Sequence, residues 1–317
     1  VAAGTFGYGL EFARSVPLDR LGALVTKTLT RQPREGNPPP RLVETPSGML
    51  NAVGLQNIGL NAFLTEKLPL LQTHRVPVIV SILGESTDET VAMVRALDQA
   101  DGVSAIELNL SCPNLNNIAD CGLRIADLKS RQSEIDNPKS AIPRMVAQDA
   151  EATRAMVQAA RHETQKPLIA KLSPDVTDLV PIAQAAVRAG AEALTIGNTF
   201  IGMSLDPVTR GSRLGALTGG LSEPAIRPLA VYRVWYTAQV VRVPIIGLGG
   251  IVRAEDALEF LLAGASAVAV GTANFADPRA PLRVLRGLER YLERHRLSSL
   301  EEVRGAINRT TAFEVQG

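Results

Sequence analysis

The run Asn109-Leu110-Ser111-Cys112-Pro113-Asn114 places the most reactive side chain of this sequence among polar groups. A cysteine thiol has an ordinary pKa of about 8.5, and it serves as a general base when it is held next to an acidic C–H group. Most free cysteines are instead small buried hydrophobes, but the polar neighbours of Cys112 favour the base. We therefore predict that Cys112 is the catalytic residue.

Two lysines, Lys27 and Lys171, lie near the ends of strongly apolar runs. A lysine that is buried without a counter-charge is costly, although a single lysine often extends its ammonium group to the surface instead. The pair is harder to explain in that way. It predicts an anion or an electron-rich ring between the two ammonium groups.

Glycines gather late in the chain, in residues 218–222, 247–250 and 271–274. Glycines often serve only as turns, but bare backbone N–H groups that follow the last strands and precede helices can bind a phosphate. Several such loops together predict a phosphate site. No G-x-G-x-x-G sequence follows the first strand, which argues against a Rossmann site.

Short apolar runs alternate with segments of helical spacing along most of the chain. The runs are near-continuous, as in strands that are buried on both faces of a parallel sheet. This alternation, repeated about eight times, favours an α/β fold with a single (β/α)8 barrel over residues 1–317, rather than an open doubly wound sheet. The expected strands are 22–30, 77–84, 105–111, 167–173, 193–199, 244–250 and 267–273, with 1–4 as the end of an eighth, and the expected helices are 88–100, 150–161, 178–189, 225–241, 254–263 and 280–294.

A barrel of this type carries its active site where the strands end, and polar residues such as Lys27, Ser81 and Asn198 do occur there. Two segments depart from the alternation. Residues 31–57 are expected to form a long polar loop. Residues 115–143 are expected to form a long insert after strand four, either a functional lid or a surface insert.

Composition excludes several classes of protein. Lys and Arg total 33 against 32 Asp and Glu, a net charge of +1. This even balance does not indicate a protein that binds nucleic acid or an anionic membrane. No apolar stretch is long enough to cross a bilayer, and no signal-peptide pattern opens the sequence. The 2 cysteines and 3 histidines match no metal motif. We expect a cytoplasmic protein without a metal site.

Ordered motifs along nearly the whole chain resemble the dihydroorotate dehydrogenases. They are GTFGYGLEF (4–12), LVTKTLT (24–30), GNPPPRLVETPSGMLNAVGLQN (36–57), NLSCPN (109–114), KLSPDVTD (171–178), GNTFIGM (197–203), TGGLSEPAIRP (218–228), GLGGI (247–251) and VGTANF (270–275). The cysteine in NLSCPN is similar to class 1, since class 2 carries serine there. The GNPPPR and GLQN motifs resemble those of the B type. In that type the catalytic subunit pairs with a second subunit that carries FAD and an iron–sulfur cluster and passes electrons to NAD.

The resemblance implies FMN-dependent oxidation of dihydroorotate to orotate in de novo pyrimidine synthesis. Cys112 would remove the C5 proton while hydride passes from C6 to flavin N5. The implied substrate residues are Asn51, Val53, Gly54, Leu55, Asn109, Asn114, Asn198 and Thr199. The implied FMN residues are Ala3, Gly4, Lys27, Thr28, Ser81, Asn109, Lys171, Gly220, Ser222, Gly249, Gly250, Gly271 and Thr272.

The chain also departs from the family pattern. Glu223 stands where B-type sequences usually have glycine, which is unfavourable beside a phosphate unless the side chain points away. Alternative hypotheses are a dihydropyrimidine dehydrogenase-type module acting on dihydrouracil, against which Asn114 argues, and a non-catalytic flavoprotein subunit. We expect a homodimer, and the sequence leaves NAD, fumarate and a quinone open as electron acceptors.

Overall fold

The apolar runs form one parallel sheet in the computed structural model, which describes residues 1–111 and 145–307. Cys112, Asn114 and the predicted insert 115–143 lie outside the described residues. The strands follow one another in the order β1, β4, β5, β6, β7, β10, β11, and each neighbouring pair is parallel. Their bounds are β1 Leu24–Val25, β4 Val78–Ile82, β5 Val103–Asn109, β6 Leu168–Leu172, β7 Ala193–Ile196, β10 Ile245–Leu248 and β11 Ala267–Ala269.

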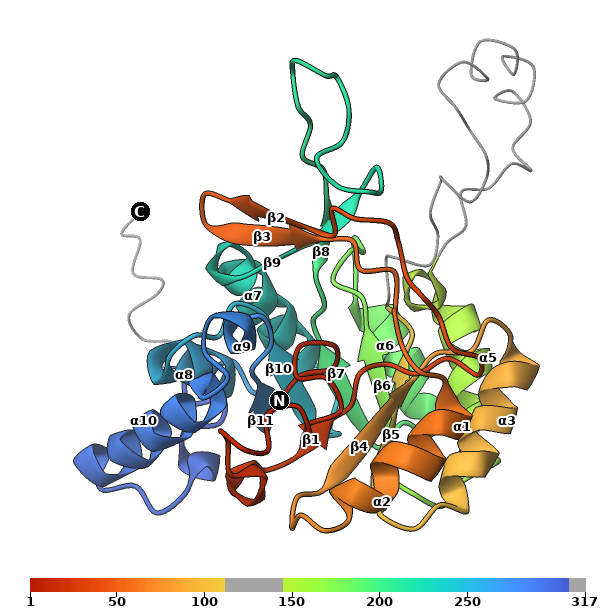
Figure 1. Ribbon diagram of the computed structural model, residues 1–317. Helices are drawn as coiled ribbons and strands as arrows, with labels where there is room; N and C mark the ends of the chain where they lie inside the picture. The colour runs from red at the N-terminus through yellow and green to blue at the C-terminus, as the bar shows by residue number, and fades with distance from the viewer. Residues whose placement is uncertain (112–144, 308–317) are drawn as a thin grey trace, which may run out of the picture.

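The sheet curls into an α/β barrel, as the alternation predicts (Figure 1). The eighth strand expected at residues 1–4 is not formed. Instead the Ala2 N–H donates to the Val270 carbonyl at 2.9 Å, and the Val1 amino group donates to the Ala23 carbonyl at 3.1 Å. The first two residues therefore lie between the ends of β11 and β1. Gly4, with φ +85°, then turns the backbone out of the extended conformation that a strand requires.

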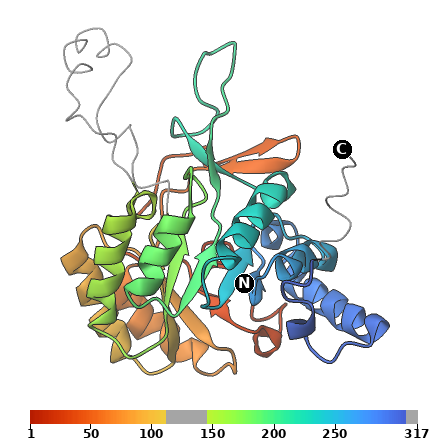
Figure 2. The ribbon, with the colours of Figure 1, turned by 180° about the vertical axis from the view of Figure 1, so that it is seen from behind.

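Helices cover the outer face of the barrel (Figures 1 and 2). The strands are buried on both sides for this reason, and all five residues of β6 are buried. Among the described helices, none is long and apolar enough to cross a membrane. Their bounds are α1 Leu60–Ala62, α2 Leu68–Leu71, α3 Thr87–Asp98, α5 Ala150–Arg161, α6 Val180–Arg188, α7 Arg227–Ala238, α8 Ala254–Leu262, α9 Ala273–Ala276 and α10 Ala280–His295, with a π-helical turn η2 Phe63–Lys67 and 3₁₀ turns η1 Leu18–Arg20, η5 Val146–Gln148, η6 Pro224–Ile226 and η7 Leu300–Glu302.

The expected helices are confirmed, and local capping explains where two of them begin. The Ser86 hydroxyl accepts a hydrogen bond from the Glu89 N–H at the start of α3. The Asp149 carboxylate does the same for the Ala152 N–H at the start of α5. Each cap satisfies one of the backbone donors that a helix N-terminus leaves unpaired.

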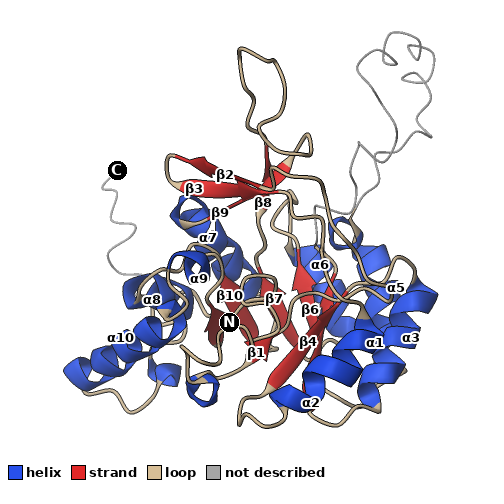
Figure 3. Cartoon of the chain, viewed as in Figure 1, coloured by secondary structure: helices blue, strands red, loops and turns tan. Residues whose placement is uncertain are grey.

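A second, antiparallel sheet lies beside the end of the barrel where the strands terminate (Figure 3). It consists of β2 Leu42–Thr45, β3 Gly48–Asn51, β9 Gly219–Ser222 and β8 Phe200–Gly202, in that order. The expectation of an irregular loop over 31–57 was therefore wrong. The reason is a long-range pairing: β3 gains a partner in β9, which is remote in sequence. At Gly48 a Cβ would lie 2.4 Å from the Ser222 carbonyl oxygen, so this approach requires glycine.

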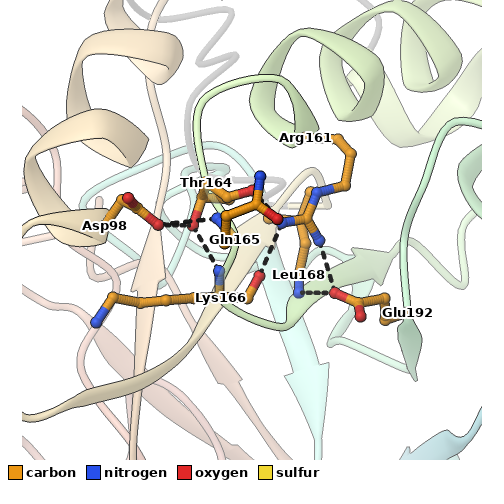
Figure 4. Close-up of polar contacts among 7 residues, drawn as sticks. All are labelled: Asp98, Arg161, Thr164, Gln165, Lys166, Leu168 and Glu192. Atoms are coloured by element: carbon orange, nitrogen blue, oxygen red, sulfur yellow. Dashed lines mark hydrogen bonds and ion pairs between the residues drawn. The ribbon is translucent and has the colours of Figure 1, made fainter.

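A polar network joins α3, α5 and β6 at the opposite end of the barrel (Figure 4). One Asp98 oxygen accepts hydrogen bonds from the Thr164 hydroxyl at 2.6 Å and the Gln165 N–H at 2.9 Å. Arg161 pairs with Glu192 at 2.6 Å. The same Glu192 oxygen accepts from the Leu168 N–H at 3.2 Å. These contacts hold the turn between α5 and β6 in place.

We predict that Asp98→Ala lowers stability at neutral pH but has little effect in acid. The hydrogen bonds from Thr164 and Gln165 lower the pKa of Asp98 below its ordinary value. The stabilisation is therefore present above the unfolded-state value of about 3.9 and is lost as the pH falls through the lower folded-state value. Urea unfolding at pH 7 and at about pH 2 checks this, because a carboxyl group with a lowered pKa takes up its proton mostly between those limits. Equal losses at both pH values would contradict it.

Candidate functional site

The mouth of the barrel contains two adjoining hollows, at the end where the strands terminate. The first has an empty volume of about 530 Å³ and the second of about 710 Å³. They are two ends of one extended site, because six residues line both: Ala3, Thr5, Lys171, Asn198, Thr199 and Thr272. Of the predicted residues, the first also contains Ser222, Gly249, Gly250 and Gly271, and the second also contains Gly4, Lys27, Thr28, Asn51, Val53, Leu55 and Asn109.

Register explains why polar side chains from separate strands meet in the mouth. Asn109 of β5 is paired in register with Lys171 of β6, and Lys171 is paired with Thr195 of β7. Side chains of neighbours in register point to the same face of a sheet. These three side chains therefore share the interior face.

A chain of hydrogen bonds crosses the mouth. The Asn109 amide donates to the Thr28 hydroxyl at 3.0 Å, and the Thr28 and Ser81 hydroxyls are 3.0 Å apart. In the other direction the Ser111 hydroxyl donates to the Asn109 side-chain oxygen Oδ1 at 3.3 Å. The Asn198 amide donates to the Ser111 hydroxyl at 2.8 Å. Two side-chain amides are thus held in fixed orientations.

The amide-rich end is also tied to the second sheet. The Asn51 side-chain amide donates to the Gly220 carbonyl at 3.2 Å. The Asn198 side-chain oxygen Oδ1 accepts from the Thr199 N–H at 2.8 Å. Amides both donate and accept, so three of them around one hollow suit a ligand with alternating ring N–H and C=O groups.

Both predicted lysines line this site. Lys171 is 5% exposed, and its ammonium group makes no ion pair or hydrogen bond with any residue in the described ranges. A buried cation in that position favours an anionic or electron-rich ligand. Lys27 lies beside Gly4: a Cβ at Gly4 would be 3.7 Å from the Lys27 Nζ atom.

Glycines shape the end that is lined by Ser222 and Thr272. Gly249 and Gly250 have φ of +131° and +69°, a conformation that favours glycine. A Cβ on Gly250 would lie 2.7 Å from the Glu223 carbonyl oxygen. At Gly271 a Cβ would meet only Ala2 and Thr5, at ordinary contact distances of 3.8 and 4.0 Å. Such bare backbone is suited to an anionic group such as a phosphate.

A buried ion pair supports the Gly249–Gly250 turn from behind. Asp256, which is 1% exposed, pairs with Arg227 of α7. Its other oxygen accepts hydrogen bonds from the Val252 and Arg253 N–H groups at 2.9 and 3.0 Å. The turn and the start of α8 are therefore fixed to α7.

Of the predicted residues that the structure describes, three line neither hollow. Ser81 is fully buried and supports Thr28 instead. Gly54, with φ +75°, packs against Asn37. Gly220 lies on β9, where a Cβ would collide with the Thr199 hydroxyl. These three residues therefore pack against residues that line the hollows or their supporting loops, and do not line the hollows themselves.

Sequence reasoning did not select Glu107, the residue beneath the mouth. Glu107 of β5 is 2% exposed, and its Oε2 accepts from the Thr195 hydroxyl at 2.9 Å. Its Oε1 is buried and has no hydrogen-bond partner in the part of the chain that the structure describes. The sequence feature that could have identified Glu107 is that it is the single acidic residue inside the apolar run 105–111. An isolated buried carboxylate is costly, so such a residue calls for a specific partner.

Comparison with known proteins gives consistent matches. The family model described as dihydroorotate dehydrogenase matches residues 1–292. The chain is 47% identical, over 96% of its length and 92% of the relative, to a protein of Geotalea uraniireducens named dihydroorotate dehydrogenase B (NAD(+)), catalytic subunit. A protein of the same name from Thermodesulfovibrio yellowstonii is 44% identical over 96% of the chain and 93% of the relative.

We predict that Thr195→Val destabilises the fold by about 1–3 kcal/mol, because it leaves a buried carboxyl group without its donor. Valine has nearly the same shape as threonine, so packing is preserved. Thr195→Ser, which keeps the hydroxyl group, is the matched control and should lose less. Urea unfolding followed by circular dichroism measures both, and a valine variant as stable as the wild type would show that the hydrogen bond contributes nothing.

Proposed function

The chain belongs to the dihydroorotate dehydrogenase family, as a class 1, B-type catalytic subunit, and from this premise we propose that it oxidises dihydroorotate to orotate with bound FMN in pyrimidine synthesis. The observation that carries the proposal is the joined pair of hollows. One end offers bare glycine backbone and the other offers oriented amides, and Lys171 lines both.

The residues at the first end fit the phosphate of FMN. Gly249, Gly250 and Gly271 line this end with backbone that carries no side chain, and Ser222 and Thr272 add hydroxyl groups. Lys171 lies where the two ends meet and would stabilise negative charge on the ring system. Lys27, beside Gly4, would act in the same way.

Substrate would bind at the amide end. Dihydroorotate presents ring N–H and C=O groups and a carboxylate, and the amides of Asn51, Asn109 and Asn198 supply both donors and acceptors. Because these amides are already oriented by Gly220, Thr28 and Ser111, little reorganisation is needed on binding. Asn114, Val53, Leu55 and Thr199 complete the proposed substrate set, and Gly54, with its positive φ, shapes the backbone between Val53 and Leu55.

Cys112 is the proposed general base, and it removes the C5 proton of dihydroorotate. Hydride transfer from C6 to N5 of the ring is the chemistry that FMN supplies when it is bound. The protein contributes position and electrostatics: the amides orient the pyrimidine, and the lysines favour the negative charge that develops.

Electrons would leave through a second subunit. Relatives of the chain are named as the catalytic subunit of an NAD(+)-dependent enzyme, which implies a separate electron-transfer partner. We propose that this partner carries FAD and an iron–sulfur cluster, and that the barrel subunit forms a homodimer within the complex.

Turnover of dihydroorotate against dihydrouracil tests the proposed substrate. We predict that the purified protein is yellow and reduces its flavin with dihydroorotate, while dihydrouracil reacts far more slowly because it lacks the carboxylate. Stopped-flow absorbance of the flavin with each substrate measures this. Reduction by dihydrouracil alone would support the alternative substrate and end the proposal.

Cys112→Ala should lower turnover by about 10²–10⁴-fold, the usual contribution of a general base, and leave the protein yellow. Wild-type activity should rise with pH as the thiolate fraction grows toward its ordinary pKa of about 8.5. Cys121→Ala is the matched control, because it removes the other cysteine. Equal rates for both alanine variants would remove Cys112 from the mechanism.

A further inference from the structure

Glu223 has a backbone conformation that side chains other than glycine rarely adopt. Its φ is 80° and its ψ is −172°. This region is populated almost only by glycine, so a residue with a side chain is strained there. Strain of this kind clusters at ligand-binding sites, so the surroundings of Glu223 are informative.

The strained residue lies at the glycine-rich end of the mouth. Glu223 lines that hollow together with Gly249, Gly250 and Gly271. Its side chain is partly buried, and no group within residues 1–111 and 145–307 donates a hydrogen bond to its carboxylate or pairs with it. Burial raises the pKa of Glu223 above its ordinary value, because a carboxylate loses hydration there.

The cationic side chains around Glu223 either pair with other carboxylates or line the same hollow. Arg227 of α7 pairs with Asp256 and Glu259 of α8, and the exposed Arg253 pairs with Glu255 and Asp256. Lys171 of β6 lines the same hollow. The strands β3 and β9, which contact the segment after Glu223, have no ionisable side chain. Nothing among these groups neutralises the Glu223 carboxylate directly.

We propose that the Glu223 carboxylate faces the phosphate of the bound cofactor, so that this chain holds FMN more weakly as the pH rises. Glu223 can act in this way only if the chain binds FMN as proposed above. When the carboxyl group is protonated it can donate a hydrogen bond to a phosphate oxygen, and when it is ionised it repels the phosphate.

The sign of the effect follows from linkage. A bound phosphate dianion favours the neutral form of Glu223, so its pKa is higher in the complex than in the free protein. Binding of FMN therefore takes up a proton, and affinity falls as the pH rises through the free-protein value toward the value in the complex. We expect repulsion between the two negative charges to lower the affinity by about tenfold or more.

The test compares two flavins and two variants of the full chain. Protein stripped of flavin is titrated with FMN and with riboflavin, which lacks the phosphate, at pH values from about 5 to 9 while flavin fluorescence is followed; the range brackets a raised glutamate pKa. Glu223→Gln removes only the charge and keeps the shape. Glu223→Gly removes the charge and also the backbone strain, and it gives the same readout if the glutamine variant fails to fold.

We expect the ratio of FMN dissociation constants, wild type over E223Q, to be near one at low pH and to rise by about tenfold or more at high pH. Riboflavin should give a ratio near one throughout. The phosphate of free FMN also ionises at a pKa of about 6, and this titration of the unbound flavin is common to both proteins and cancels in the ratio.

A constant FMN ratio across the pH range would overturn the proposal, because the carboxylate would not face the phosphate. A ratio that rises equally for FMN and riboflavin would also overturn it, since the effect would then lie in packing and not in phosphate charge. Failure of wild type and variants alike to bind either flavin would instead overturn the proposed function itself.

Discussion

The hydrogen-bonded chain across the barrel mouth is the feature on which the site depends. It joins β4, β1, β5 and β7 through Ser81, Thr28, Asn109, Ser111 and Asn198. Thr28, Ser111 and Asn198 follow the ends of β1, β5 and β7, so the parallel order of these strands brings the amides and their partners together. Without that register the same residues would be separate polar ends of unrelated strands.

The two ends of the mouth are held by different physical means. Neutral hydrogen bonds orient the amide end, and they remain intact across the ordinary range of pH. At the glycine-rich end a buried ion pair between Arg227 and Asp256 fixes the backbone, and breaking one partner of such a pair is costly. Glu223 adds backbone strain and an ionisable carboxyl group at that end.

Burial accounts for the parts of the fold that sequence patterns predict well. The run 167–173 is near-continuously apolar and β6 is buried throughout; the run 244–250 likewise contains β10. Where a strand depends on a remote partner, the pattern fails. Residues 42–51 read as a polar loop, yet β2 and β3 form because β9 pairs with β3.

The sequence by itself determined the barrel class, the main helices, and most of the residues that line the mouth, because apolar periodicity and strand-end polarity are local properties of the chain. Only the tertiary structure decided that Gly220 packs against the Thr199 side chain and that the Ser81 hydroxyl forms a hydrogen bond with Thr28. It also revealed that Glu107 is buried against Thr195 and that Glu223 occupies a glycine-like conformation. These features arise from contacts between segments far apart in the sequence, whose distances no local pattern encodes.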